Sequence, residues 1–393
     1  MKLEKPRLPV TTVNDAASLE NLLEKLDSTR EIGLDAERAS GFRYSNRAYL
    51  IQIATSDEIF LVDPVPLETE PNWNKKLASA MEGPTWILHS ATQDLPCLAE
   101  LSIKPKSIFD TELAARLVGI ERFGLASLAE QLLGLELAKE HSAADWSKRP
   151  LSESMLNYAA LDVDILFEIW EALSQRASEL GRDSWLVQEF AQLLHFQPKS
   201  AALEPWRNLP GMSKVRDVNR QKIAASLWQV RDKIAREQDV APGRLIPDRS
   251  IAAVVAKPPK SKRELAGNKE FQGRASRSML EQWWRAIELS QEIEIGDQVL
   301  DPNHIPNHRS WEKRFPEAHI RLREVRAGLQ EKALELELAV ELLITPDTLR
   351  RVCFAPEEDV AAQLQSHKVR EWQLEIVLPI IRAGLERSRA QSA

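Results

Sequence analysis

The chain of 393 residues has few cysteines and no long apolar run. Its two cysteines, Cys97 and Cys353, lie far apart in the sequence, which excludes a disulfide framework and the paired spacing of a zinc site. Such sparse cysteine usage is typical of a reducing compartment, so we expect a cytoplasmic location. No segment approaches the ~18 consecutive apolar residues of a membrane span, and the N-terminus has no signal-peptide pattern. We therefore expect no association with a membrane.

The charge of the chain is unevenly distributed. Residues 201–290 contain 18 Lys+Arg against 10 Asp+Glu, a balance of +8. Residues 1–200, with 20 against 31, and residues 291–393, with 14 against 18, are acidic, so the net charge is −7. A basic module beside acidic ones is typical of proteins that hold a phosphate backbone. The alternative is that the basic segment docks on its acidic neighbour.

The first part of the chain alternates strand and helix patterns. Short β-rich runs predict strands at residues 31–37, 48–55, 58–63, 85–89 and 107–110. Ser56-Asp57 between the second and third runs indicates a hairpin, and helical patterns occupy residues 94–101 and 111–118. A meander of three strands followed by strand–helix–strand units predicts a mixed α/β sheet.

From Leu125 onward the pattern is helical. Apolar residues recur at three- and four-residue steps over residues 127–133 and 152–180. We expect a continuous helix over the second of these segments, with Ser152 as its N-cap and Gly181 at its end. A linker follows near residues 197–205, and the rest of the chain is helical.

Two short segments recur in this helical C-terminal half. Residues 227–234 resemble residues 322–329, and residues 245–248 resemble residues 344–347, at offsets of 95 and 99 residues. Their common order and nearly equal spacing predict a diverged tandem repeat of small helical domains.

Asp35 and Glu37 close the first predicted strand. Residues i and i+2 of a strand point to the same face, about 6–7 Å apart, so the two carboxylates repel each other unless a cation lies between them. A divalent cation is the usual solution in proteins. The alternative is an exposed strand end with two solvated acids.

Three further residues are candidates for the same chemistry. Asp94 opens a helix directly after a strand, where it could instead be an N-cap. Tyr158 and Asp162 lie four residues apart inside the helix predicted at 152–180, so their side chains share one face. That face could also be ordinary helix surface. The order of an Asp-X-Glu pair, an Asp at a helix start and a Tyr-X-X-X-Asp pair is harder to explain by chance.

At this point the chain resembles the DEDD exonuclease superfamily, in the subgroup whose third motif carries a tyrosine, and within it the ribonuclease D family. The segments that carry the resemblance are residues 34–37, 48–53, 61–64, 89–98, 109–111, 145–146 and 149–151. The two helical blocks look like HRDC domains (helicase and ribonuclease D, C-terminal). The resemblance implies an α/β, RNase H-like exonuclease domain with a mixed sheet at residues 1–195. Two small all-α bundles follow, a basic HRDC-like domain at 205–292 and a diverged, acidic one at 300–393.

The resemblance also assigns roles to the five candidate residues. Asp35, Glu37, Asp94 and Asp162 match the four metal-binding carboxylates of the family, and Tyr158 matches its catalytic tyrosine. By this match Asp35 bridges two ions, Glu37 and Asp162 help to hold the ion that activates water, and Asp94 helps to place the other. A neutral phenol, with its usual pKa near 10, suits the positioning of that water better than the abstraction of its proton, unless the metal ions lower that pKa.

The chemistry of phosphodiester hydrolysis supports this assignment. Two divalent ions about 3.5–4 Å apart activate a water molecule and neutralise charge on the leaving oxygen. Four carboxylates without a His or Cys cluster suit Mg²⁺ or Mn²⁺ and disfavour zinc. We therefore expect two Mg²⁺ or Mn²⁺ ions.

Other residues are candidates for substrate contact. Arg43 and Tyr44 follow the first predicted strand and could bind a phosphate or stack on a base, or simply be solvated in a loop. Lys260, Lys262 and Arg263 lie in the basic module and are candidates for RNA backbone contact, with a solvated loop as the alternative. His89 and Cys97, on either side of Asp94, are expected in the core.

The sequence thus indicates a metal-dependent 3′→5′ exoribonuclease that releases nucleoside 5′-monophosphates from structured RNA, notably at tRNA 3′ ends. A DNA 3′→5′ exonuclease is the alternative enzyme, because the same two-metal chemistry serves both polymers; the HRDC-like resemblance favours RNA. A catalytically dead RNA-binding scaffold is the alternative outside enzymes, and it predicts the loss of at least one acid. We expect RNA partners and a monomer, although nothing in the sequence decides the oligomeric state.

Overall fold

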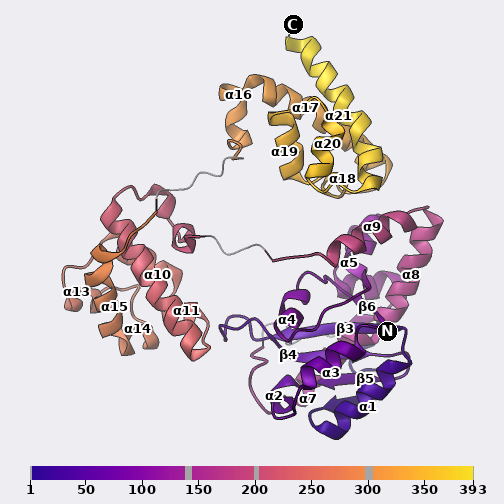
Figure 1. Cartoon of the computed structure of the whole chain (residues 1–393), viewed down its shortest axis with the longest axis horizontal. Coiled ribbons are helices and arrows are strands. Elements are labelled where there is room, and N and C mark those ends of the chain that lie inside the picture. The colour runs from indigo at the N-terminus through magenta and orange to yellow at the C-terminus, as the bar shows by residue number, and fades with distance from the viewer. Residues whose placement is uncertain (1, 138–143, 199–202, 297–303, 393) are drawn as a thin grey trace.

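The computed structural model describes residues 2–137, 144–198, 203–296 and 304–392. Figure 1 shows an N-terminal α/β domain and two separate helical domains. No helix among the described residues combines the length and apolar character that a membrane span requires.

A six-stranded mixed sheet forms the centre of the N-terminal domain. Its order is β2-β5-β4-β3-β6-β7. The strands are β2 (Val10–Val13), β3 (Glu31–Arg38), β4 (Ala48–Ala54), β5 (Ile59–Val62), β6 (Thr85–Leu88) and β7 (Ile108–Asp110). β4 is antiparallel to both β3 and β5, and the other neighbours are parallel. Two short strands, β1 (Lys2–Leu3) and β8 (Glu136–Leu137), pair separately.

The helices of this domain pack around the sheet, and α9 also contacts the C-terminal domain. They are α1 (Ala16–Asp27), α2 (Pro64–Leu67), α3 (Trp73–Ala80), α4 (Leu95–Glu100), α5 (Thr111–Leu117), α6 (Leu125–Leu128), the π-helix η1 (Ala129–Leu133), α7 (Glu153–Asp164), α8 (Leu166–Glu179) and α9 (Asp183–Leu193). Every residue of β4 is buried, as expected for a strand covered on both faces.

The mixed α/β sheet predicted from the sequence is confirmed. All five predicted strands form, and the hairpin at Ser56-Asp57 joins the antiparallel β4 and β5. The edge strand β2 was not predicted, because Val10-Thr-Thr-Val13 is short and half-exposed, with only Val13 fully buried. Its parallel pairing with β5 depends on a partner almost fifty residues away.

The continuous helix predicted over residues 152–180 is wrong. Ser152 caps the start as predicted, but the helix breaks at Ile165 into α7 and α8. Arg7 explains the break, because its guanidinium donates to the backbone carbonyl of Asp164 at 2.8 Å and to the carboxylate of the same residue at 2.9 Å. A side chain that donates to a helix carbonyl competes with the backbone N–H that would otherwise bind that carbonyl, and this interrupts the helix.

The middle domain is a helical bundle with its own core. It contains η2 (Pro205–Asn208), η3 (Met212–Lys214), α10 (Val218–Gln238), α11 (Pro242–Leu245), α12 (Asp248–Ala256), α13 (Lys262–Ala266), α14 (Arg274–Ser278), α15 (Leu280–Glu288) and η4 (Leu289–Glu292). Trp206, Phe271 and Trp283 are buried at its centre. Part of the linker predicted at 197–205 lies outside the described residues.

The C-terminal domain repeats the start of this bundle. It contains η5 (His308–Ser310), α16 (Trp311–Arg314), α17 (Pro316–Glu335), α18 (Val340–Leu343), α19 (Pro346–Phe354), α20 (Val360–Ser366) and α21 (Glu371–Ser392). A long helix, a four-residue helix and a nine-residue helix follow one another in both domains, as α10–α12 and as α17–α19. The recurring segments noted in the sequence lie at matching places in these two series.

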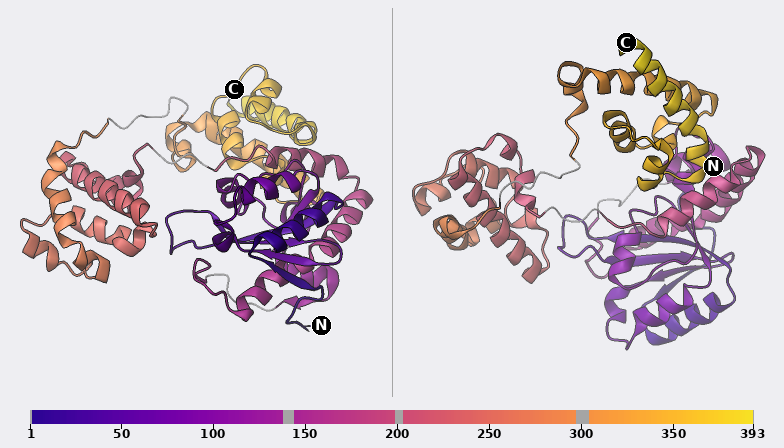
Figure 2. Two further views of the ribbon diagram at one scale, coloured as in Figure 1. Left: turned by 60° about the horizontal axis from the view of Figure 1, so that its bottom comes forward. Right: turned by 45° about the horizontal axis from the view of Figure 1, so that its top comes forward.

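The two helical domains differ in how they join the α/β domain. The buried residues of the C-terminal domain are continuous with the core of the α/β domain, whereas the middle domain has a separate core. Trp185 on α9 stacks on Trp372 with ring centroids 4.4 Å apart, and Arg370 forms a two-point ion pair with Glu189. Figure 2 shows the C-terminal domain beside the α/β domain in both views.

Candidate active site

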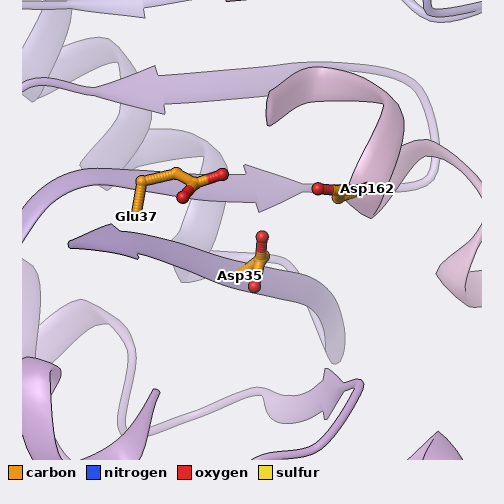
Figure 3. Close-up of side chains that lie close together, drawn as sticks. All are labelled: Asp35, Glu37 and Asp162. Atoms are coloured by element: carbon orange, nitrogen blue, oxygen red, sulfur yellow. The ribbon is translucent and has the colours of Figure 1, made fainter. Parts of the chain in front are cut away.

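Three carboxylates from two elements meet above the central strand. Asp35 and Glu37 leave the same face of β3, and Asp162 faces them from α7, as Figure 3 shows. One carboxylate oxygen of each residue lies within 4.8 Å of the others. Like charges at this separation are stable only if they bind protons or a cation.

The fourth acid, Asp94, lies between β6 and α4. Its side chain makes no capping hydrogen bond to α4, so the alternative of a simple N-cap does not apply. The carboxyl group is buried, and burial together with the charge of Asp35 raises its pKa. Asp94 therefore extends the acidic cluster from β3 towards β6.

Tyr158 lies one helical turn before Asp162 on α7. Burial and the charge of the nearby Asp162 raise the pKa of its phenol. The buried indole of Trp146 packs near the phenol, with ring centroids 6.3 Å apart. The phenol therefore lies between Trp146 and the acids.

Arg149 anchors the segment that leads into α7. Its guanidinium binds the carboxylate of Asp63, after β5, through two contacts of 2.6 Å. A third contact, of 2.7 Å, joins it to the backbone carbonyl of Tyr49 on β4. Two-point pairs of arginine and carboxylate fix orientation as well as distance. The start of α7 is therefore held against β4 and β5, and Tyr158 and Asp162 are placed over the sheet.

All five residues line one cavity of about 510 Å³. Its walls are formed by Leu34, Asp35, Ala36, Glu37, Arg38, His89, Ser90, Gln93, Asp94, Leu125, Ala126, Leu137, Tyr158, Asp162 and Leu166. The lining combines the acids with apolar side chains, among them Leu125, Ala126 and Leu137. Such a cavity can hold cations at its carboxylates and an apolar or aromatic ring against its apolar side chains.

Burial and mutual repulsion raise the pKa values of the acids. Burial raises the pKa of Asp35, and burial together with the charge of Asp35 raises the pKa values of Asp94 and Asp162. The pKa of Glu37 rises to about 9, through burial first and then through the charges of the other three acids. Four such groups favour protons or divalent cations over the free anionic state.

Comparison with known proteins places this site in a family. Residues 10–177 match the family described as 3′-5′ exonuclease, residues 220–287 match the HRDC domain, and residues 304–385 match the family described as 3′ to 5′ exonuclease C-terminal domain. A ribonuclease D from Shewanella sp. (strain ANA-3) is 30% identical over 273 residues, which cover 67% of this chain and 68% of the relative.

The chain belongs to the ribonuclease D family. It is a 3′-5′ exoribonuclease, a hydrolase of phosphodiester bonds, with a mixed-sheet exonuclease domain and a helical HRDC region. The family and fold predicted from the sequence are thus confirmed.

Solved structures agree with this fold along the whole chain. The crystal structure of a protein from Bifidobacterium adolescentis is 33% identical, with a TM-score of 0.90, and the match covers 98% of this chain and 99% of that one. The structure of Escherichia coli RNase D is 21% identical, with a TM-score of 0.71 over 97% of this chain and 99% of that one.

The sequence analysis did not predict the place of two residues that line this cavity. Arg38, directly after the Asp-X-Glu pair, is the one Lys or Arg among the described residues that line the cavity, and its charge opposes the rise that burial causes in the pKa values of Asp35 and Asp94. His89 was expected in the core but lines the cavity, where its Nδ1 is bonded to the hydroxyl of Thr111 at 2.9 Å. Burial lowers the pKa of His89 to about 4, so the ring is neutral at neutral pH.

The loop residues proposed for substrate contact bind other parts of the protein. Arg43 donates to the hydroxyl of Ser147 at 2.8 Å, and the hydroxyl of Tyr44 donates to Asp232 on α10 at 3.0 Å. The Tyr44 side chain packs against the core of the middle domain, and its backbone NH donates to Asp239. Substrate contact by these two residues stays a prediction, and Tyr44 has a clear structural role between the domains.

The basic residues proposed for RNA contact lie at the start of α13. Lys262 is ion-paired with Glu281, and the backbone NH of Lys260 donates to Glu264 at 2.7 Å. Arg263 is exposed. In Figure 1, α13 lies on the side of the middle domain that is farthest from the exonuclease domain. The structure does not bring these residues together with the acidic cavity.

Without divalent ions, the raised pKa of Glu37 makes stability depend on pH. The folded state keeps a proton that the unfolded state loses above about pH 4.5, so stability falls as the pH rises towards about 9. We expect the thermal unfolding midpoint in EDTA to fall between about pH 6 and pH 8.5, and to recover at pH 8.5 when Mg²⁺ is added. The Glu37→Gln variant should show a flatter decline, and equal declines in both proteins would contradict this assignment.

Proposed function

We propose that this ribonuclease D trims the 3′ ends of structured RNA, notably tRNA precursors, and releases nucleoside 5′-monophosphates. The observation that carries the proposal is the convergence of Asp35, Glu37, Asp94, Tyr158 and Asp162 on one open cavity of the exonuclease domain. The chain retains every acid of the expected set, which disfavours a catalytically dead scaffold.

The carboxylates of the cavity fit two Mg²⁺ or Mn²⁺ ions. The ligand atoms are oxygens, and those of Asp35, Glu37 and Asp162 lie close enough together to share a cation. We propose that Asp35 holds both ions, that Glu37 and Asp162 hold one of them, and that Asp94 helps to place the other. When bound, such ions lower the pKa of a water molecule and stabilise charge on the leaving oxygen.

Tyr158 acts in this proposal as the group that positions the attacking water. Burial and the neighbouring charges of Asp162, Glu37 and Asp35 raise the pKa of its phenol well above the usual value. A phenol that keeps its proton can donate or accept a hydrogen bond but is a poor base. Its place one turn from Asp162 puts the hydroxyl beside the ligand that holds the water-activating ion.

The polymer preference is proposed to be RNA rather than DNA. The catalytic residues suit both polymers, so the preference rests on the helical domains and on the family. We also propose a cytoplasmic monomer for this chain. Both of its cysteines are free and buried, which fits a reducing compartment.

The test of the proposed substrate uses two polymers of equal length. A 3′-extended tRNA and a single-stranded DNA are incubated with the enzyme in Mg²⁺ or Mn²⁺, and chain length is followed over time. We expect stepwise shortening of the tRNA at its 3′ end and slower degradation of the DNA. Faster degradation of the DNA would overturn the RNA assignment.

Neutralising the basic residues of α13 tests their place in RNA binding. We expect the triple change of Lys260, Lys262 and Arg263 to Ala to weaken RNA binding and to flatten its dependence on salt. Each lost phosphate contact lowers the slope of log K against log salt by roughly 0.7–0.9. Binding is measured at several salt concentrations, with a Lys75→Ala, Lys76→Ala double variant of α3 as control. An unchanged slope would exclude this segment from the RNA interface.

A further inference from the structure

Gln52 is a buried polar residue without a partner. It lies in the middle of β4 with none of its surface exposed. Both atoms of its side-chain amide are buried, and neither has a hydrogen-bond partner. Within the described part of the chain, no other residue has both a donor and an acceptor of one side chain left in this state. An unmade buried hydrogen bond costs about 1–3 kcal/mol, so such a residue needs an explanation.

The register of the sheet places Gln52 directly opposite Asp35. β3 and β4 are antiparallel, and Asp35 and Gln52 are paired residues in that ladder. Paired residues of an antiparallel ladder project to the same face, with Cβ atoms about 4.5–5.5 Å apart. Gln52 therefore lies on the face of the sheet that carries the acids.

The neighbours of Gln52 on this face along β4 and directly across on β5 are apolar. Leu61 is its partner on β5, and Leu50 and Ala54 precede and follow it by two residues on β4. All three are fully buried. Among these four sheet neighbours, Asp35 is the one that can accept a hydrogen bond from the Gln52 amide.

Little space separates this face from the helices above it. A Cβ atom added to Gly33, the next residue of β3 on the same face, would lie 3.3 Å from the carbonyl oxygen of Val163 and 3.5 Å from Leu166. Helix α7 thus covers the sheet closely on the inner side of Asp35. Gln52 does not line the cavity. Its amide would therefore meet Asp35 from outside the cavity.

We propose that Gln52 is a positioning residue for Asp35, and that its amide Nε2–H donates to the Asp35 carboxylate when divalent ions are bound. The inference rests on the proposed role of Asp35 as a metal ligand. The amide orients the carboxylate from the side opposite the ions. A hydrogen-bond donor behind a metal ligand fixes the direction of the ligand's lone pairs before the ion binds.

A neutral donor suits this position better than any alternative. A Lys or Arg would pair with Asp35 and repel the cations. A carboxylate would repel Asp35, and an apolar side chain would leave its orientation free. A glutamine keeps the full charge of Asp35 available to the ions, and its side chain is long enough to span the distance between paired strands.

The test measures Mn²⁺ binding by calorimetry, without RNA, on four proteins. They are the wild type, Gln52→Met, Gln363→Met and Asp35→Asn. Methionine keeps the volume of glutamine and removes its hydrogen bonds. Gln363 is a buried glutamine of the C-terminal domain that donates to Ala355 and accepts from Glu357, so its variant controls for the same chemical change outside the site. Thermal unfolding in EDTA is measured for each protein.

We expect Gln52→Met to bind Mn²⁺ roughly 10-fold to 100-fold more weakly than the wild type. Its unfolding midpoint should equal or exceed that of the wild type, because an unsatisfied amide is removed. Gln363→Met should show the reverse, an unchanged Mn²⁺ affinity and a lower midpoint. Wild-type Mn²⁺ affinity in Gln52→Met would overturn the inference.

Asp35→Asn separates this inference from the proposed function. If it binds Mn²⁺ as the wild type does, the proposed metal site itself is wrong. If Gln52→Met does not fold, a crystal structure of the wild type with Mn²⁺ decides the question. It should show Gln52 Nε2 within about 3.2 Å of an Asp35 carboxylate oxygen. An amide bonded elsewhere, or to nothing, would overturn the inference.

Discussion

The Asp35→Asn variant is expected to lose RNA hydrolysis by roughly 10³-fold or more while its affinity for RNA changes little. The asparagine amide keeps the size of the side chain but removes the charge that is proposed to hold both ions. Losing about 4 kcal/mol of stabilisation corresponds to roughly 10³-fold in rate. Single-turnover cleavage of a labelled RNA measures the rate, and binding in EDTA measures the affinity.

The control for this variant is Asp57→Asn. Asp57 is exposed in the β4–β5 turn and ion-paired with Lys25, so the same change there removes a charge outside the cavity. Its cleavage rate should remain within about twofold of the wild type. Cleavage by Asp35→Asn at the rate of this control would refute the site.

The Tyr158→Phe variant is expected to lower kcat by roughly 100-fold without changing the Mn²⁺ affinity. The hydroxyl lies near Asp162, and it is proposed to orient the attacking water. A misplaced nucleophile costs about this much even when all other groups are present. Because the phenol keeps its proton at neutral pH, the pH profile of the variant should keep the shape of the wild-type profile.

A second tyrosine supplies the comparison for this change. Tyr49 on β4 has a buried ring, and its hydroxyl contacts Asp239 of the middle domain at 3.3 Å rather than the cavity. Tyr49→Phe should retain most of the wild-type kcat. A loss of Mn²⁺ affinity in Tyr158→Phe, with kcat falling in proportion, would mean that the phenol supports the metal site instead of the water.

The sequence predicted the sheet and the acidic pairs because those features are local. Because side chains alternate along a strand, Asp35 and Glu37 must share a face. Because Tyr158 and Asp162 are about one helical turn apart, their side chains also share a face. Their meeting across β3 and α7 is not local, and it followed only from the resemblance to a family. The break at Ile165 was invisible because it depends on Arg7, more than 150 residues away.

The other features that were not predicted also depend on contacts between residues that are distant in the sequence. Arg38 adjoins the Asp-X-Glu pair, but only the structure shows that its side chain turns to the cavity after the irregularity in β3 between residues 37 and 38. Gln52 looked like part of a buried strand, and its relation to Asp35 is a matter of strand register. Tyr44 was judged as a loop residue, whereas the middle domain supplies its partners.

The measurement that tests the central claim most directly is product analysis of an RNA labelled at its 5′ end. Wild type and Asp35→Asn are incubated in Mg²⁺, in Mn²⁺ and in EDTA, and the products are resolved by length and composition. The account predicts a ladder shortened from the 3′ end, together with nucleoside 5′-monophosphates, for the wild type with either ion and for no other combination. Cleavage in EDTA, or internal fragments in place of a ladder, would contradict it.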